Sequence, residues 1–299
     1  MDSKVNVICP YSSTVLESYG PHITKTGTAI RTMSVSSDAR YIVLGFSSEY
    51  IVVHDRNNKA EPASGKEFKL NEGERVKTVQ LSKDSKWMIA TMVSGDKTKI
   101  VKYSFPEMVP QKERLVSFNT TCCVLTPDDS QIWFGSDSAI RALRTADLED
   151  LFDEDVGSIT DLQIYKNAFV VCPVVDQQKV YFYSIRDQCD VYSMKVHNHA
   201  RTAAVHPDIN IIVVGGGLEA KLVANTKEGN NVLTQYYDLV NKQLVFEQEI
   251  HSGPTHKIRW SPDGLGMASA SEDGSVAIHR FGDELLQYKY DDQWVNAEK

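Results

Sequence analysis

The chain has 299 residues, of which 41% are hydrophobic and 24% are charged, a composition that predicts a globular protein with a large core. Its formal net charge of −8 disfavours direct binding to a nucleic-acid backbone. The chain shows neither an apolar run of membrane-spanning length nor the apolar stretch of a signal peptide. We therefore expect a cytoplasmic protein that binds neither nucleic acid nor membranes.

A pattern of short strands and turns repeats along the chain. Residues 5–20 contain two predicted strands, and longer versions of the pattern follow at 29–55, 75–103, 120–143, 158–183, 201–217 and 251–281. Each longer version has one landmark residue in its first turn, namely Asp38, Asp84, Asp128, Asn167, Asp208 and Asp263. The spacings are 46, 44, 39, 41 and 55 residues. Periods near 40–45 residues with several short strands are typical of WD repeats.

The turn chemistry is clearest in the last repeat. Pro262-Asp263-Gly264 and Asp273-Gly274 separate predicted strands at 257–260, 266–270 and 276–280. Proline fixes φ, aspartate caps the turn, and glycine accepts a positive φ. No apolar pattern of period 3.6 continues beyond three turns, so a helical fold is disfavoured.

These repeats predict an all-β, seven-bladed WD40-type β-propeller in a single domain, residues 1–299. The first blade, residues 1–28, would be incomplete at its N-terminal side, and six further blades would occupy 29–295. One four-stranded sheet cannot bury both of its faces, but sheets packed against one another can.

The sequence contains one motif that resembles a cofactor site. Residues 215–220 fit the dinucleotide fingerprint G-x-G-x-x-A, and Asp238 follows 21 residues after Gly217. The fingerprint must open a helix, however, and the residues that follow have the composition of a loop. His197 and His199 lack a third metal ligand nearby, and no motif of a catalytic nucleophile or metalloprotease occurs. We expect no catalytic residue, no cofactor, no metal and no enzymatic activity.

Residues 147–155 form the densest acidic segment. Leu148, Leu151 and Phe152 lie at one-face helical spacing among the acids. The segment is interpreted either as a solvated surface or as a surface for a basic partner.

The last repeat also carries four polar residues where WD repeats place a buried hydrogen-bonded network: His251, Ser271, Asp273 and His279. Such a network fixes one packing arrangement when all its groups are satisfied. We therefore predict a structural role for these four residues.

A more specific resemblance lies in the C-terminal third. Four segments resemble, in order and spacing, motifs of the i-subunit family of eukaryotic translation initiation factor 3: 215–220 for G-G-G-Q-E-A, 251–254 for H-F-G-P, 272–274 for E-D-G and 278–281 for I-H-x-F. Residues 5–20 are similar to the family's V-N-V-W-Y-S segment. Leu218 stands where the family has glutamine, and Leu222 where it has aspartate.

The resemblance implies a scaffold subunit that holds the b and g subunits of the factor and works on the small ribosomal subunit with mRNA and initiator tRNA. It also places candidate partner contacts at Gly217, Leu218, Glu219 and Leu222. Two alternatives remain open. One is a WD-repeat adaptor for a receptor kinase or a ubiquitin ligase, and the other is a hydrolytic propeller.

Overall fold

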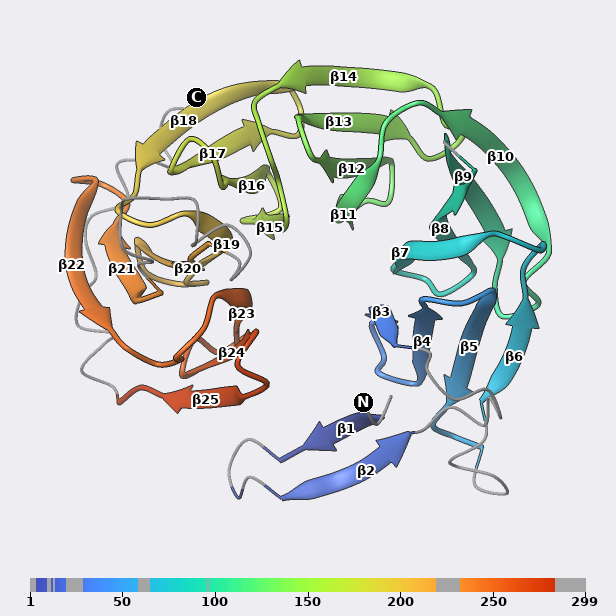
Figure 1. The fold of residues 1–299 in the computed structure, drawn as a ribbon, viewed down its shortest axis with the longest axis horizontal. Coiled ribbons are helices and arrows are strands. Elements are labelled where there is room, and N and C mark those ends of the chain that lie inside the picture. Colours follow the sequence, from blue (N-terminus) through green and yellow to red (C-terminus); the bar gives the residue numbers. More distant parts are fainter. Residues whose placement is uncertain are drawn as a thin grey trace. The chain divides into compact units, whose positions relative to one another are not determined.

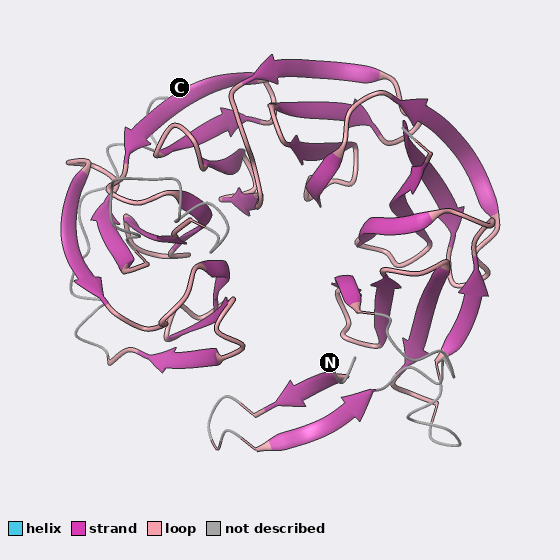
Figure 2. Cartoon of the chain, in the orientation of Figure 1, coloured by secondary structure: helices cyan, strands magenta, loops and turns pink. Residues whose placement is uncertain are grey.

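The computed structural model describes residues 4–9, 12, 14–19, 29–58, 65–95, 97–218 and 232–282. Within these ranges every regular element is a strand, as Figure 2 shows. The strands form small antiparallel sheets in which consecutive strands pair (Figure 1). The chain divides into two compact units, one of residues 1–136 and 141–153, the other of 137–140 and 154–299.

The first unit holds a two-stranded hairpin and most of three blades. The hairpin consists of β1 (Val5–Ile8) and β2 (Val15–Tyr19). The first blade consists of β3 (Ile30–Val35), β4 (Tyr41–Phe46), β5 (Tyr50–Asp55) and β6 (Lys66–Lys69). The second consists of β7 (Arg75–Leu81), β8 (Trp87–Ser94), β9 (Lys97–Ser104) and β10 (Pro110–Val116). The third consists of β11 (Thr120–Leu125), β12 (Gln131–Ser136), β13 (Ala139–Arg144) and β14 (Asp150–Asp155).

The second unit holds the other three blades. The fourth consists of β15 (Gln163–Tyr165), β16 (Phe169–Val174), β17 (Lys179–Ser184) and β18 (Cys189–Lys195). The fifth consists of β19 (Ala200–Val205), β20 (Ile211–Gly216), β21 (Thr234–Asp238) and β22 (Gln243–Gln248). The sixth consists of β23 (Thr255–Trp260), β24 (Gly266–Ser271) and β25 (Val276–Arg280).

The prediction of all-β, WD40-type propeller blades is confirmed, but the predicted number of seven is wrong. Six blades are present, five with four strands and a last one with three in the described residues. In the described part of residues 1–28, which were expected to form a seventh, partial blade, the structure has a hairpin of β1 and β2 only. A two-stranded hairpin is too small to form a blade of its own, because three or more strands are needed for a stable sheet. Val5 and Val7 instead pack on the core of the first blade, against buried residues such as Leu44.

Burial changes across each blade. In the first five blades the second strand is largely buried, as in β20, where all six residues of Ile211–Gly216 are buried, whereas β24 of the sixth blade is only partly buried. Within each unit the first strand of a blade packs against strands of the preceding blade, so inner strands are covered on both faces. This explains the continuous run of Ile and Val in β20. The fourth strands are the most exposed, and they carry more charged residues than the first, second or third strands.

All six landmark residues lie in the turn between the first and second strands of a blade. In four of these turns a hydroxyl donates a hydrogen bond to the aspartate two residues later. Ser36 Oγ lies 2.6 Å from Asp38 Oδ1, and Thr126 Oγ1 lies 2.7 Å from Asp128 Oδ1. The same aspartate oxygen accepts a backbone N–H, as Asp38 does from Arg40 at 3.0 Å. The hydrogen bond from Ser36 holds the pKa of Asp38 below its usual value.

The acidic segment is a strand and a turn, so the helical interpretation is wrong. Leu148 is buried in a turn with a φ of 62°, and β14 begins two residues later. Phe152 packs on Trp133 with ring centroids 5.4 Å apart. Four of the acids form ion pairs, Asp150 with Arg114 at 2.5 Å, Asp153 with Arg141 at 3.0 Å, and Asp147 and Glu149 with Arg144 at 2.7 and 3.6 Å. Arginines of the same unit therefore neutralise part of this acidic surface.

Candidate functional site

The three glycines of the dinucleotide-like motif are required by packing inside the protein. A Cβ atom on Gly215 would lie 2.7 Å from Ile258 Cδ1, and one on Gly216 would lie 1.9 Å from the carbonyl oxygen of His199. Gly217 has a φ of 116° and donates its N–H to that same oxygen at 3.1 Å. Each glycine thus allows a close approach or a left-handed turn at the end of β20.

The acidic residue of the same motif is also used internally. Asp238, at the end of β21, accepts hydrogen bonds from the backbone N–H of Val240 at 2.7 Å and from Nδ2 of Asn241 at 2.8 Å. A hollow of about 250 Å³ beside this turn is lined by Asn210, Ile211, Asp238, Asn241, Gln243, Leu244 and Val245. In a dinucleotide-binding motif this carboxylate would bind the ribose. Here Asp238 instead stabilises a turn of the fifth blade.

The candidate partner-binding residues fall at the border of the described part of the chain. Gly217 and Leu218 follow β20 directly, and Leu218 is only 8% exposed. Glu219 and Leu222 lie outside the described residues. Of the four candidates, the structure therefore describes only Gly217 and Leu218.

The structure brings three of the four predicted network residues together in the sixth blade. Asp273 Oδ2 lies 3.5 Å from Nδ1 of the buried His251 and accepts the Ser252 N–H at 2.9 Å. The N–H of Asp273 donates to Ser271 Oγ at 3.3 Å, and Ser271 Oγ donates to Gly253 O at 3.0 Å. The hydrogen bonds of Asp273 hold its pKa well below the usual range, beginning with that from the Ser275 hydroxyl.

Two serines complete this network and were missed in the sequence. His251 Nε2 lies 2.7 Å from Ser269 Oγ, and His251 Nδ1 lies 2.8 Å from Ser275 Oγ. Both ring nitrogens are therefore satisfied by hydroxyls. The spacing of Ser269 and Ser271 along one strand was the available signal, because residues two apart on a strand lie on the same face of the sheet.

His279 is not joined to this network by a hydrogen bond. Its Nε2 atom is buried and has no partner among the described residues. Burial lowers the pKa of His279, and the nearby His251 lowers it further. A neutral imidazole is therefore favoured at this position.

A second polar centre lies in the second unit at Asp161, just before β15. Asp161 is 1% exposed. It accepts hydrogen bonds from Lys257 Nζ at 2.6 Å, from Arg259 at 2.8 and 2.9 Å, and from Thr202 Oγ1 at 2.6 Å. Burial opposes ionisation of Asp161, but the charges of Arg259 and Lys257 outweigh it and lower its pKa to about 2. One carboxylate thus connects the inner strands of three successive blades.

No local pattern around Asp161 indicates this role. Its partners lie 41, 96 and 98 residues away along the chain. The partners of Asp161 give a weak signal in the sequence, because Lys257 and Arg259 alternate with the buried Ile258 on an inner strand. Two cations beside a core require a counter-charge.

Among the described residues, no group of three or more His, Cys, Asp or Glu side chains is arranged to hold a metal ion. In the same ranges, no helix has the length and apolar character needed to cross a membrane.

Comparison with known proteins adds two findings. The family model described as "WD domain, G-beta repeat" matches residues 242–280, which form β22 and the whole described sixth blade. Subunit I of eukaryotic translation initiation factor 3 from Meyerozyma guilliermondii is 30% identical over 151 residues, covering 46% of this chain and 40% of the relative. The chain thus contains a segment that matches the WD repeat, and about half of it is similar to subunit I of this factor.

The same similarity extends across distant organisms. The subunit I of Caenorhabditis elegans is 25% identical over 183 residues, covering 58% of this chain and 55% of the relative. That of Saccharomyces cerevisiae strain S288c is 32% identical over 91 residues, covering 30% of this chain and 26% of the relative. The chain thus spans about half the length, or less, of the curated relatives that it matches.

Proposed function

We propose that this chain is a non-catalytic scaffold subunit of a translation initiation factor 3 complex. The similarity to subunit I of that factor carries the proposal. The blade architecture supports it, because packed blades offer rigid, exposed outer surfaces for partner proteins. The polar centres at His251 and Asp161 are occupied by internal hydrogen bonds, as expected of a structural element.

We further propose that the chain acts in the cytoplasm as a single propeller domain, and that its partners are the b and g subunits of the factor. Through them it would take part in bringing mRNA and initiator tRNA to the small ribosomal subunit. The net charge of −8 supports association with basic protein segments, since opposite charge speeds encounter.

We place the partner contact at the segment that begins with Gly217 and Leu218 and continues through Glu219 and Leu222. The buried Leu218 supports this placement because it fixes where the segment starts. Glu219 would then supply the charge that a basic partner recognises, and Leu222 an apolar contact.

Purification of the tagged full chain from its own cytosol tests the proposal. We expect the b and g subunits to remain bound, and Glu219→Lys to weaken their recovery. The matched charge reversal Asp153→Lys should have less effect, because Asp153 is already neutralised by Arg141. Recovery of kinase or ubiquitin-ligase components in place of initiation factor subunits would overturn the proposal.

A further inference from the structure

The fourth strand of each complete blade is a sheet edge, and such edges invite pairing with another chain unless they are protected. Proteins protect edges with charged residues or proline. Four of the five edges are protected in this way: β6 by Lys66, Glu67 and Lys69, β10 by Pro110 and Lys112-Glu113-Arg114, β14 by Asp150 and Asp153-Glu154-Asp155, and β18 by Asp190 and Lys195.

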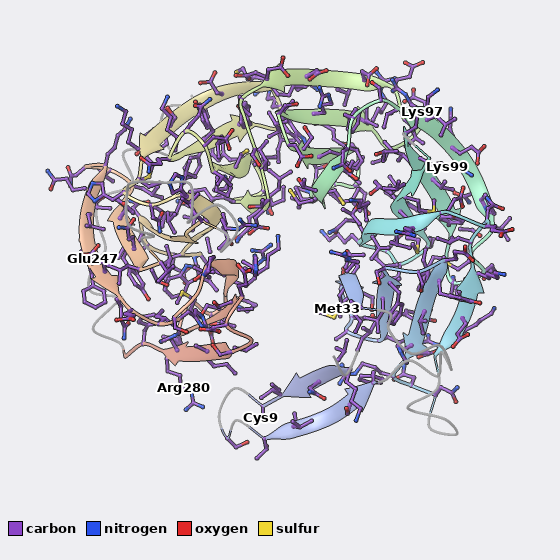
Figure 3. The ribbon with its side chains drawn as sticks, viewed as in Figure 1. Cys9, Met33, Lys97, Lys99, Glu247 and Arg280 are labelled. Atoms are coloured by element: carbon purple, nitrogen blue, oxygen red, sulfur yellow. The ribbon has the colours of Figure 1, made fainter. Side chains whose placement is uncertain are left out.

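The edge of the fifth blade, β22, lacks this protection. Glu247 is the single charged residue among its six, and Figure 3 shows it on this outer strand. Val245 is 46% exposed and its neighbour Phe246 is 54% exposed. Among the described fourth strands, β22 alone exposes two adjacent large hydrophobic residues.

Comparison with β18 isolates this difference. Val191 and Val245 occupy the same bulged position, each lying between two residues that pair with consecutive residues of the third strand. The next residue on β18, Tyr192, is buried and donates its hydroxyl to Leu239 O at 2.6 Å. Its counterpart on β22, Phe246, is exposed. The edges of β18 and β22 therefore share the same bulged backbone, but only β22 exposes a large aromatic side chain beside its exposed valine.

The charged residues around β22 indicate the charge of the partner segment. Glu247 lies on the strand and Glu249 follows it, and both are exposed. Lys242 is directed to the preceding blade, where its Nζ donates to Ser193 O at 3.0 Å. The apolar pair is therefore accompanied by negative charge. A second copy of the chain is disfavoured as the occupant, because each copy carries a net charge of −8.

We propose that the outer edge of β22 binds an extended segment of a partner protein that alternates apolar and basic residues, by adding it as a fifth strand. Backbone hydrogen bonds would give affinity, and Val245, Phe246 and Glu247 would select the side chains. This inference rests on the proposed function only in that the chain holds protein partners.

The test uses the full chain and a seven-residue peptide that alternates lysine and valine. Amide hydrogen exchange should slow in β22 when the peptide is added, and remain unchanged in β18. Val245→Lys should weaken peptide binding at least tenfold, whereas the matched Val191→Lys should change it less than twofold. A peptide that alternates lysine and serine, with the same charge, should bind at least tenfold more weakly.

Three results would overturn the inference: no protection of β22 at millimolar peptide, equal loss of binding in the two variants, or equal binding of the serine peptide. Equal urea midpoints for the two variants would show that both are folded. Salt-dependent dimers formed through β22 would assign the edge to a second copy and also refute it. Recovery of initiation factor subunits by the Val245→Lys chain reports separately on the proposed function.

Discussion

Replacement of Asp161 by asparagine should destabilise the second unit more than any other isosteric change of a described carboxylate. The carboxylate accepts hydrogen bonds from Lys257, Arg259 and Thr202. Asparagine keeps the shape but turns an N–H₂ group toward these donors and removes the charge. Donors would then face one another in a buried position.

The size of the effect follows from two estimates. The pKa of Asp161 falls from 3.8 to about 2 on folding, and at about 1.36 kcal/mol per pKa unit this favours the folded state by roughly 2 kcal/mol. Breaking a fully buried ion pair costs about 3–5 kcal/mol. Lys257 and Arg259 are each 47% exposed and can turn to water, which lowers the cost. We expect a loss of about 2–3 kcal/mol at pH 7.

The assay is urea unfolding at several pH values, together with amide hydrogen exchange in β15, β19 and β23. Because the folded pKa of Asp161 is lowered, its contribution is complete above about pH 4 and is lost as the pH falls toward 2. The difference between the two proteins should therefore shrink over that interval. Asp153→Asn is the matched control, since Asp153 is 58% exposed and its ion pair should contribute less than about 1 kcal/mol.

Two results would refute this reasoning. One is an Asp161→Asn protein within about 0.5 kcal/mol of the wild type at pH 7, the range of ordinary surface substitutions. The other is a difference between the two proteins that stays constant from pH 7 to pH 2. Either result would mean that the carboxylate is not held as the structure shows.

Three further changes test other parts of the fold. His251→Ala should lower the free energy of unfolding by about 1–3 kcal/mol in urea, because Ser269 and Ser275 lose a buried partner; an effect no larger than that of Ser252→Ala would contradict this. Gly216→Ala should cost about 3 kcal/mol or more, since its Cβ would lie 1.9 Å from His199 O. Gly282→Ala, with open space around it, should be nearly neutral, and equal unfolding midpoints for these two variants would show that the packing is wrong. Arg56→Ala should speed amide exchange in β1 and β2, because Arg56 makes two hydrogen bonds to Glu17 of the hairpin; unchanged exchange would show that the hairpin is held by its apolar contacts alone.

The repeat of turns made the blades predictable, since Asp38 and Asp263 each mark the same hydrogen-bonded turn in their own blade. The number of blades was not predictable, because residues 5–20 look the same as a hairpin or as half of a blade. The spacing of hydrophobic residues also failed to predict the structure at Leu148, because this residue takes a left-handed turn conformation that usually requires glycine.

One of the two polar centres was partly predictable from the sequence, and the other was not. His251 and Asp273 stand at positions that the repeat itself marks, but the serines that contact His251 are Ser269 and Ser275, not the predicted Ser271. Asp161 could not be found, because its significance comes from partners in two later blades. The proposed contact residues Glu219 and Leu222 lie outside the described residues and remain predictions.

The match of the repeat model to residues 242–280 has a consequence for how such a chain can be shortened or rearranged. That stretch begins with β22, which completes one blade, and continues with the three strands of the next. Truncation of the chain before residue 242 would remove the outer strand of the fifth blade. Truncation after Gln248 would leave that sheet with all four strands. Duplication or loss of one repeat exchanges strands between adjacent sheets and keeps each sheet whole. The unit that a gene can copy is therefore displaced by one strand from the unit that packs.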